Sequence, residues 1–206
     1  MEGHLVLADG TVYRGKVFGS RVSQISEGEV VFNTSLTGYQ ELLTDPSYCG
    51  QIVIMTNPLV GNYGINSFDF ESDRIQVKGL IVREVCDKPN HWQMVMTLPK
   101  YLESENIIGL TGIDTRALTR QIRKHGTMKG ILCAGARSPA ELKRLAARAR
   151  ESRGAEGQDL TALVSTPIPY RIQDSPNDRS QVDPLLIPDL VKPITEELQP
   201  SRAASG

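Results

Sequence analysis

Residues 28–66 read GEVVFNTSLTGYQELLTDPSYCGQIVIMTNPLVGNYGIN, and this stretch decides the fold class because strand and helix signals alternate along it. The run 28–34 is a short apolar strand. We expect one or two helical turns over 37–46 that stop at Pro46, because proline biases the residue before it away from the helical region. The β-branched run 51–57 is typical of a strand that is buried on both faces.

The sequence on either side continues this alternation. Upstream, residues 4–18 predict a β-hairpin, because two alternating apolar runs flank Asp9–Gly10, a preferred two-residue turn. Downstream, HWQMVMT (91–97) is ambiguous between strand and loop. The further strands that the sequence predicts are 79–85, 107–113 and 128–135.

Three more helices are predicted from the residues at their ends, over 98–106, 114–126 and 138–150. Asp114 can cap the second helix and Gly126 can end it. Ser138 and Glu141 form a capping box at the start of the third. A β-rich first half followed by alternating strands and helices predicts a mixed α/β domain over residues 1–165.

Residues 166–206 differ in kind from the rest of the chain. They hold seven of the 12 prolines and no glycine before the last residue, and no helix or strand period persists. Such a segment cannot bury enough apolar surface to offset its chain entropy. We therefore expect an irregular, Pro-rich linker or arm, in which 185–191 is either a short docking stretch or plain solvated chain.

Composition narrows the class of protein. A chain of 206 residues with a formal net charge of −1, 39% hydrophobic and 23% charged residues is typical of a soluble protein of one or two domains. The near-zero charge predicts no nucleic-acid or membrane partner, and no apolar run approaches the ~20 residues of a membrane span. The N-terminus MEGHLVLADG lacks the features of a signal peptide, so we expect a cytoplasmic protein.

Cys49 invites a catalytic interpretation, because a thiolate in a hydroxyl-rich loop would be a nucleophile if a base lay beside it. A thiolate needs a base or a cation to lower its pKa. The chain offers only His4, His91 and His125, and the sequence places none of them near Cys49. Wide, irregular spacing argues against both a disulfide framework and a metal site for the three cysteines, Cys49, Cys86 and Cys133.

The remaining polar clusters are weaker candidates. VGNYGIN (60–66) has two glycines but no phosphate-binding pattern. Asp69, Glu71 and Asp73 are typical of a solvated edge, and the basic residues of 143–153 indicate a wet helix face more simply than a docking face. Residue types and spacing alone therefore predict an α/β domain without a complete catalytic set.

Read together, these blocks resemble a known family. Residues 28–66 closely resemble the N-terminal domain of the small subunit of glutamine-hydrolysing carbamoyl-phosphate synthase, and the resemblance continues through 7–19, 79–84, 109–132 and 157–165. It implies a layered β/β/α domain of the swivelling type, followed in this chain by the Pro-rich tail.

The resemblance also implies a place in a larger complex. In that family the domain helps to dock the large subunit, and an amidotransferase domain with a Cys–His–Glu set follows it and releases ammonia from glutamine. The large subunit uses ATP, Mg and bicarbonate to make carbamoyl phosphate for arginine and pyrimidine synthesis. Beyond Ser165 this sequence has no Cys, no His and no glycine before Gly206, so we expect no catalytic residue, cofactor or metal in these 206 residues.

Ser47, in TDPSY, is the one site residue that the resemblance carries over, because the matching serine of the family contacts the bound glutamine. A hydroxyl both donates and accepts, which suits the zwitterionic end of an amino acid. From the residues alone, a structural role for Ser47 in the Asp45–Pro46 turn is the simpler interpretation, and the resemblance reverses that preference.

Three hypotheses follow. The first is an N-terminal scaffold domain of the small subunit, with the large subunit and glutamine as partners. The second is a stand-alone, non-catalytic binding or regulatory module derived from that domain. The third is a self-contained thiol enzyme that uses Cys49. We favour the first, because the ordered blocks are far more specific than any short pattern.

Overall fold

The computed structural model of the chain describes residues 1–21, 25–152, 154 and 158–165. The Pro-rich segment 166–206 lies outside the described residues, so the linker or arm that the sequence predicts there stays a prediction. Among the described residues, no helix is long and apolar enough to cross a membrane.

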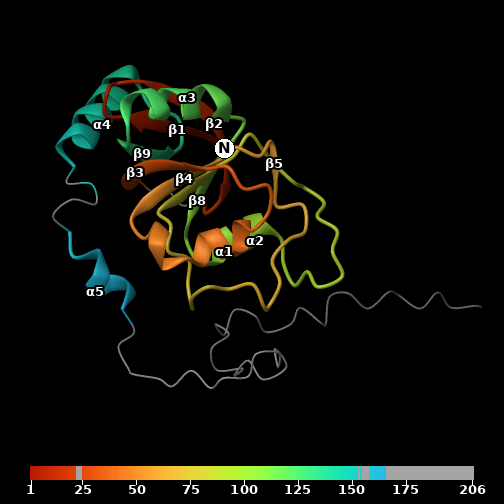
Figure 1. The fold of residues 1–206 in the computed structure, drawn as a ribbon. Helices are drawn as coiled ribbons and strands as arrows, with labels where there is room; N and C mark the ends of the chain where they lie inside the picture. Colours follow the sequence, from red (N-terminus) through yellow and green to blue (C-terminus); the bar gives the residue numbers. More distant parts are fainter. Residues whose placement is uncertain (22–24, 153, 155–157, 166–206) are drawn as a thin grey trace, which may run out of the picture.

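Seven strands close into a barrel (Figure 1). They are β1 (Glu2–Leu7), β2 (Val12–Gly19), β3 (Ile25–Asn33), β4 (Gln51–Met55), β6 (Gly79–Ile81), β8 (Ile108–Thr111) and β9 (Met128–Ala134). Their order around the barrel is β1-β2-β8-β6-β4-β3-β9. Pairing is parallel from β3 through β4 and β6 to β8, and antiparallel around the rest. A separate parallel pair joins β5 (Leu59–Val60) to β7 (Glu84–Val85).

Helices cover the barrel on opposite sides. They are α1 (Tyr39–Thr44), the 3-10 turn η1 (Pro46–Tyr48), α2 (Leu98–Ser104), α3 (Thr115–His125), α4 (Pro139–Glu151) and α5 (Leu160–Val164). In Figure 1, α3 and α4 lie above the barrel, and α1 and α2 lie below it. Leu42 and Leu43 of α1 share one buried cluster with Leu102 of α2, which places the α1–β4 connection on the lower side.

Alternate positions of each barrel strand face the interior. Leu5 and Leu7 of β1 pack inside with Ile52 and Ile54 of β4, and all four are fully buried. Val6, between the two leucines, belongs instead to the cluster that α4 covers from outside. This period of two is what the pleat of a strand dictates, so the aliphatic runs of the sequence fill both the barrel and its outer layers.

The mixed α/β class is confirmed, and so are most of the predicted elements. Ser138 and Glu141 form the predicted capping box. Helix α1 stops before Pro46, and Asp45 is extended with φ −69° and ψ 120°. The hairpin is also confirmed, but its connection covers residues 8–11 and is longer than the predicted two-residue turn. The Asp9 side chain closes that connection by accepting a hydrogen bond from the Thr11 N–H at 2.8 Å.

Some elements differ from the prediction. The strand predicted over 28–34 begins earlier, at Ile25, because its first residues pair with β9. The run 79–85 divides into β6 and β7, which belong to different sheets. Residues 91–97 form a loop with one bridge, from Met96 to Ile65. The closed barrel and α5 were not predicted, and the layered β/β/α description stays a prediction.

Candidate functional site

Ser47 lies in a tight connection between α1 and β4. Asp45 is both the C-cap of α1 and the N-cap of η1, and its Oδ1 accepts a hydrogen bond from the Ser47 N–H at 2.8 Å. Pro46 occupies the start of η1, where its fixed φ suits the helical turn. The Cys49 N–H donates to the Pro46 carbonyl at 3.0 Å. The backbone around Ser47 is therefore held by its immediate neighbours.

The Ser47 side chain takes no part in that turn. The residue is exposed, and its hydroxyl forms no hydrogen bond within the part of the chain that the structure describes. Asp45 Oδ1 accepts its hydrogen bond from the Ser47 N–H and not from the Ser47 hydroxyl. The two roles that the sequence offers for Ser47 are thus compatible, since the backbone N–H serves the turn and the hydroxyl takes no part in it.

Tyr48 ties the Ser47 connection to the end of β3. Its hydroxyl accepts a hydrogen bond from Asn33 Nδ2 at 2.9 Å, and its ring packs against the buried cluster beneath α1. Asn33 Oδ1 in turn accepts from the Ser35 N–H at 2.7 Å. One asparagine therefore organises the loop after β3 and contacts the loop that carries Ser47.

A second support comes from residues 60–66, the glycine-containing segment. The N-cap of α1 is Gly38, which has φ 81° and no side chain to cap the helix. The Tyr63 hydroxyl accepts instead from the N–H groups of Gly38 and Tyr39, at 2.7 Å and 3.3 Å. The Tyr39 and Tyr63 rings stack with centroids 4.3 Å apart, and the Tyr39 hydroxyl donates to the Gly64 carbonyl at 2.6 Å. Helix α1 is thus anchored from a distant loop.

Buried Gln40 joins the same two segments through a reciprocal amide pair. Its Nε2 donates to the Asn66 carbonyl and its Oε1 accepts from the Asn66 N–H, both at 2.8 Å. Asn66 Nδ2 then donates to Asp69 Oδ2 at 2.6 Å. A buried amide with both ends paired favours one geometry, so this pair fixes the loop beside α1.

Glu41 of α1 is a carboxylate that lies partly buried beside the Ser47 connection. Burial raises the pKa of the Glu41 carboxyl above its usual value, and the negative charges of Asp69 and Glu71 raise it further. Its own backbone N–H acts in the opposite direction by lowering the pKa. Glu41 Oε2 is buried without a hydrogen-bond partner among the described residues. The ionised carboxylate is therefore unfavourably placed in the folded domain.

The structure brings no base to Cys49. Cys49 is half-buried, and none of the hydrogen bonds or ion pairs among the described residues joins its thiol to a histidine. His4 is buried in β1 and lies opposite Cys133, while His91 and His125 are exposed elsewhere. Burial raises the pKa of the Cys133 thiol, although Arg137 lowers it, which indicates a core thiol. No Cys/His nucleophilic pair is assembled in the described chain.

The other candidate clusters do not assemble a reactive centre either. Asp69 is occupied by its hydrogen bond with Asn66, and Glu71 and Asp73 are exposed. In the described residues, no group of three or more His, Cys, Asp or Glu side chains is arranged to hold a metal ion. Among the described residues around Ser47, the hydroxyl is therefore the exposed polar group that stays without a partner.

Sequence reasoning missed two residues that shape this site, Tyr63 and Gln40. The sequence indicates no phosphate-binding pattern in the segment that carries Tyr63, and the capping role of Tyr63 depends on a contact between residues 25 apart. One signal was available, because a glycine N-cap leaves the first N–H groups of a helix without a local acceptor. No local signal identifies Gln40.

The matching family and three similar curated proteins all name the same protein. Residues 5–132 match the family described as "Carbamoyl-phosphate synthase small chain, CPSase domain". The carbamoyl phosphate synthase small chain of Syntrophotalea carbinolica is 49% identical over 181 residues, which are 88% of this chain and 47% of that protein.

Two shorter matches are closer in identity. The small chain of Bacillus caldolyticus is 57% identical over 133 residues, covering 65% of this chain and 36% of that protein. The pyrimidine-specific small chain of Halalkalibacterium halodurans is 58% identical over 133 residues, with the same coverage of 65% and 36%. The chain therefore spans about half or less of the length of these curated relatives.

Proposed function

Because the chain belongs to the family of carbamoyl-phosphate synthase small chains, we propose that residues 1–165 act as the N-terminal scaffold domain of such a small subunit. The observation that carries this proposal is the match over residues 5–132, supported by relatives that are 49%, 57% and 58% identical. Small-chain relatives imply a complex with a large subunit. In that complex the domain docks the large subunit and completes one wall of the glutamine site.

The complex would make carbamoyl phosphate from glutamine, bicarbonate and ATP in the cytoplasm, for arginine and pyrimidine synthesis. The pyrimidine-specific name of the Halalkalibacterium halodurans relative supports the pyrimidine part of this assignment. ATP and Mg²⁺ belong to the large subunit, and we assign neither to a residue of this chain. The layered β/β/α swivelling description of the domain is part of the same proposal.

Ser47 supplies the contact with glutamine. Its turn is held by three hydrogen bonds, in which Asp45 Oδ1, the Asp45 carbonyl and the Pro46 carbonyl are the acceptors. Its exposed hydroxyl is free of partners within the described residues. A hydroxyl can accept from the α-ammonium group of glutamine and donate to its carboxylate. Ser47 binds and orients the substrate in this proposal, and the amide is cleaved by groups that these 206 residues do not contain.

Two measurements on the purified 206-residue chain test the proposal. Gel filtration with a family large subunit should show the two chains eluting together at micromolar concentration. Incubation of the chain alone with glutamine should release no ammonia above the rate in buffer. Separate elution would contradict the docking role, and steady ammonia release would contradict the scaffold role.

A further inference from the structure

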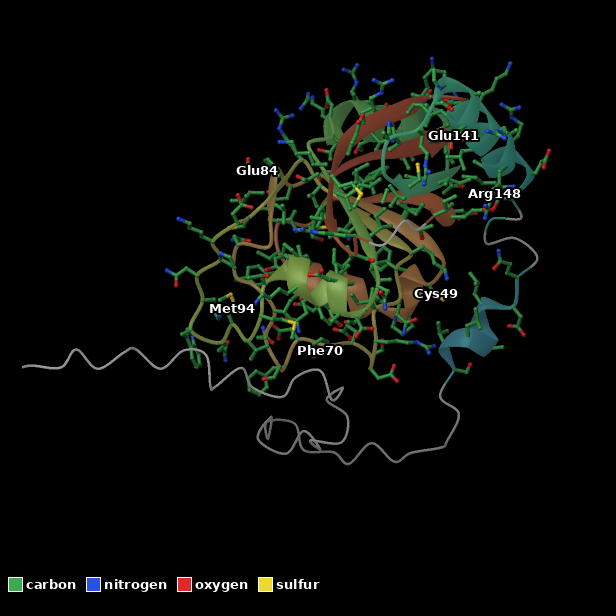
Figure 2. The ribbon with its side chains drawn as sticks, turned by 180° about the vertical axis from the view of Figure 1, so that it is seen from behind. Cys49, Phe70, Glu84, Met94, Glu141 and Arg148 are labelled. Atoms are coloured by element: carbon green, nitrogen blue, oxygen red, sulfur yellow. The ribbon has the colours of Figure 1, made fainter. Side chains whose placement is uncertain are left out.

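Helix α5 returns to the Ser47 connection, although more than 100 residues separate the two in sequence. Arg74 Nη2 donates a hydrogen bond to the Leu163 carbonyl at 2.7 Å, near the end of α5. The Leu160 side chain lies over Gly50, where Leu160 Cδ2 would be 3.6 Å from an added Cβ. Figure 2 shows Cys49, which follows the Ser47 connection, on the same side of the molecule as α5.

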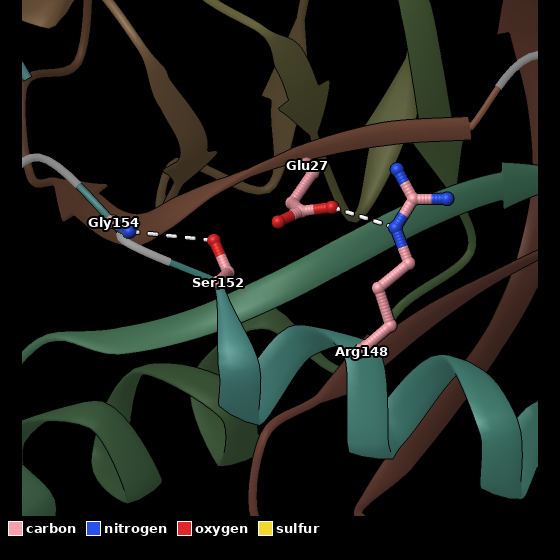
Figure 3. Close-up of polar contacts among 4 residues, drawn as sticks. All are labelled: Glu27, Arg148, Ser152 and Gly154. Carbon is pink, nitrogen blue, oxygen red and sulfur yellow. Dashed lines mark hydrogen bonds and ion pairs between the residues drawn. The ribbon is translucent and has the colours of Figure 1, made fainter.

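The described parts of the path from α4 to α5 are fastened to the barrel edge. Arg148 in the last turn of α4 forms an ion pair with Glu27 of β3, with Arg148 Nε 2.9 Å from Glu27 Oε2 (Figure 3). Lys129 Nζ donates to the Ser152 carbonyl. The Gly154 N–H donates to Ser152 Oγ at 3.3 Å, as Figure 3 also shows. The chain therefore leaves α4 in a defined direction.

At α5 itself the fastening is slight. The helix has five residues, which is too short to be stable alone, and Leu163 is 57% exposed. The last carbonyls of a helix lack partners within the helix and carry its negative dipole end. Arg74 satisfies one of these carbonyls with a cationic donor. Among the described residues, this is the one side-chain hydrogen bond that joins α5 to the barrel domain, so we expect the position of this end of α5 to depend on Arg74.

Arg74 is also connected to the site from its own side. In the segment that carries it, the Ser72 hydroxyl donates to the Thr44 carbonyl at 2.5 Å and the Gln76 N–H donates to the Leu43 carbonyl at 2.8 Å. Leu43 and Thr44 are the end of α1, directly before Asp45 and the Ser47 turn. Hydrogen bonds therefore connect the Arg74 segment to the end of α1, directly before the Ser47 turn.

We infer that Arg74 is a positioning residue of the glutamine site, which clamps α5 against the Ser47 connection without touching glutamine. This inference rests on the proposed function. The matched part of the longer relatives is their N-terminal part, so their remaining sequence continues beyond the position of α5. By holding α5 beside Ser47, Arg74 fixes the position of the wall that Ser47 forms. That position is fixed relative to the sequence that follows α5 in these relatives. The proposed ligand is still glutamine, and Arg74 only positions the residues around it.

The first test measures α5 directly in the 206-residue chain by amide hydrogen exchange. Arg74→Ala should speed exchange at residues 161–165 about tenfold, as expected when one hydrogen bond to a charged group no longer opposes local opening. Arg74→Lys should fall between Ala and wild type, because lysine keeps a cationic donor but lacks the planar fork. Arg116→Ala is the matched control, since Arg116 is an exposed arginine on α3, and it should leave this exchange unchanged.

The second test uses a complete small chain that carries these residues, assembled with its large subunit. Arg74→Ala should raise KM for glutamine about three- to tenfold, with kcat and ammonia-dependent synthesis unchanged. Arg74→Lys should recover part of the loss and Arg116→Ala should have no effect. Ser47→Ala is measured beside them, so that failure of the proposed function can be recognised separately.

Each outcome decides between the two claims. Faster exchange in α5 together with a raised KM for glutamine in Arg74→Ala supports the clamp. Faster exchange with an unchanged KM overturns the clamp, while a raised KM in Ser47→Ala would leave the proposed function standing. A raised KM without faster exchange also overturns it, because Arg74 would then act by another route. If neither variant changes KM, both claims fail.

Discussion

The Tyr63 hydroxyl accepts a hydrogen bond from the Gly38 N–H at 2.7 Å, so a residue 25 positions downstream caps the first turn of α1. Helix α1 leads directly into the Ser47 turn, and its own N-cap is a glycine without a capping side chain. The cap joins residues 60–66 to the hydroxyl-rich segment before β4. The position of Ser47 therefore depends on two loops that the barrel holds together.

Tyr63→Phe should destabilise the domain by about 1–3 kcal/mol, because the N–H groups of Gly38 and Tyr39 lose their acceptor while the ring stack is kept. Urea unfolding followed by circular dichroism would measure the loss. Tyr48→Phe is the matched control, since it removes one hydroxyl whose hydrogen-bond partner among the described residues is the Asn33 side chain, at 2.9 Å. We expect that control to cost less, about 0.5–1.5 kcal/mol. Equal losses in the two variants would contradict the capping role.

Glu41→Gln should stabilise the domain at pH 7 and make no difference near pH 3.5. Burial raises the pKa of Glu41 above its usual 4.5, so the folded state holds this proton more tightly than the unfolded state. The stabilisation is complete below the unfolded pKa and is lost as the pH rises through the folded pKa. The neutral amide introduced by Glu41→Gln resembles the protonated carboxyl, so this variant avoids the loss of stability at higher pH.

The measurement for Glu41 is the free energy of unfolding of both proteins between pH 3.5 and 8. The difference between them should grow as the pH rises above about 4.5. Glu103→Gln, at an exposed position on α2, is the control and should show no such trend. A Glu41→Gln variant that is less stable at pH 7 would show that the carboxylate has a stabilising partner.

Gly28→Ala should destabilise the domain by about 1–3 kcal/mol through overpacking. A Cβ on Gly28 would lie 2.4 Å from the Gly50 carbonyl oxygen, which is backbone and cannot rotate away. Gly79→Ala is a useful comparison, because its Cβ would meet the flexible end of Leu132 at 2.3 Å. Chemical denaturation should show the larger loss for Gly28→Ala, and the reverse order would contradict the close approach of β3 to the Ser47–Gly50 loop.

The three cysteines should differ in reactivity in the native chain. Cys49 and Cys86 are half-buried, whereas Cys133 is fully buried and burial raises the pKa of its thiol. We expect a thiol reagent at pH 8 to label Cys49 and Cys86 first and to reach Cys133 only when urea unfolds the domain. Mass spectrometry of labelled peptides would read the order, and early labelling of Cys133 would contradict its place beneath α4.

Elements defined by neighbouring residues could be predicted from the sequence. The Ser138–Glu141 capping box and the stop of α1 before Pro46 depend on residues within one turn of each other. The hairpin was predicted for the same reason, and only the length of its connection was wrong. Closure of the barrel was not predictable in this way, because it requires β3 and β9 to pair across about 100 residues.

The same holds for the candidate site, where local features could be predicted and long-range contacts could not. Ser47 was identified by resemblance, and its turn by the Asp-Pro pair, but nothing local indicated that the hydroxyl would stay out of the turn. The clamp by Arg74 and the amide pair of Gln40 join residues that are 89 and 26 positions apart. Such contacts become visible only when the strands have placed the loops.

The role of this domain in the glutamine site is best tested by the kinetics of Ser47→Ala in a complete small chain assembled with its large subunit. KM for glutamine should rise about tenfold while ammonia-dependent synthesis is unchanged, because one hydrogen bond to a charged substrate group is lost. Ser35→Ala is the matched control, since Ser35 is also exposed and its N–H also donates to the side chain two residues earlier, at 2.7 Å. An unchanged KM for glutamine in Ser47→Ala, or an equal loss of ammonia-dependent synthesis, would contradict the role of this domain in the glutamine site.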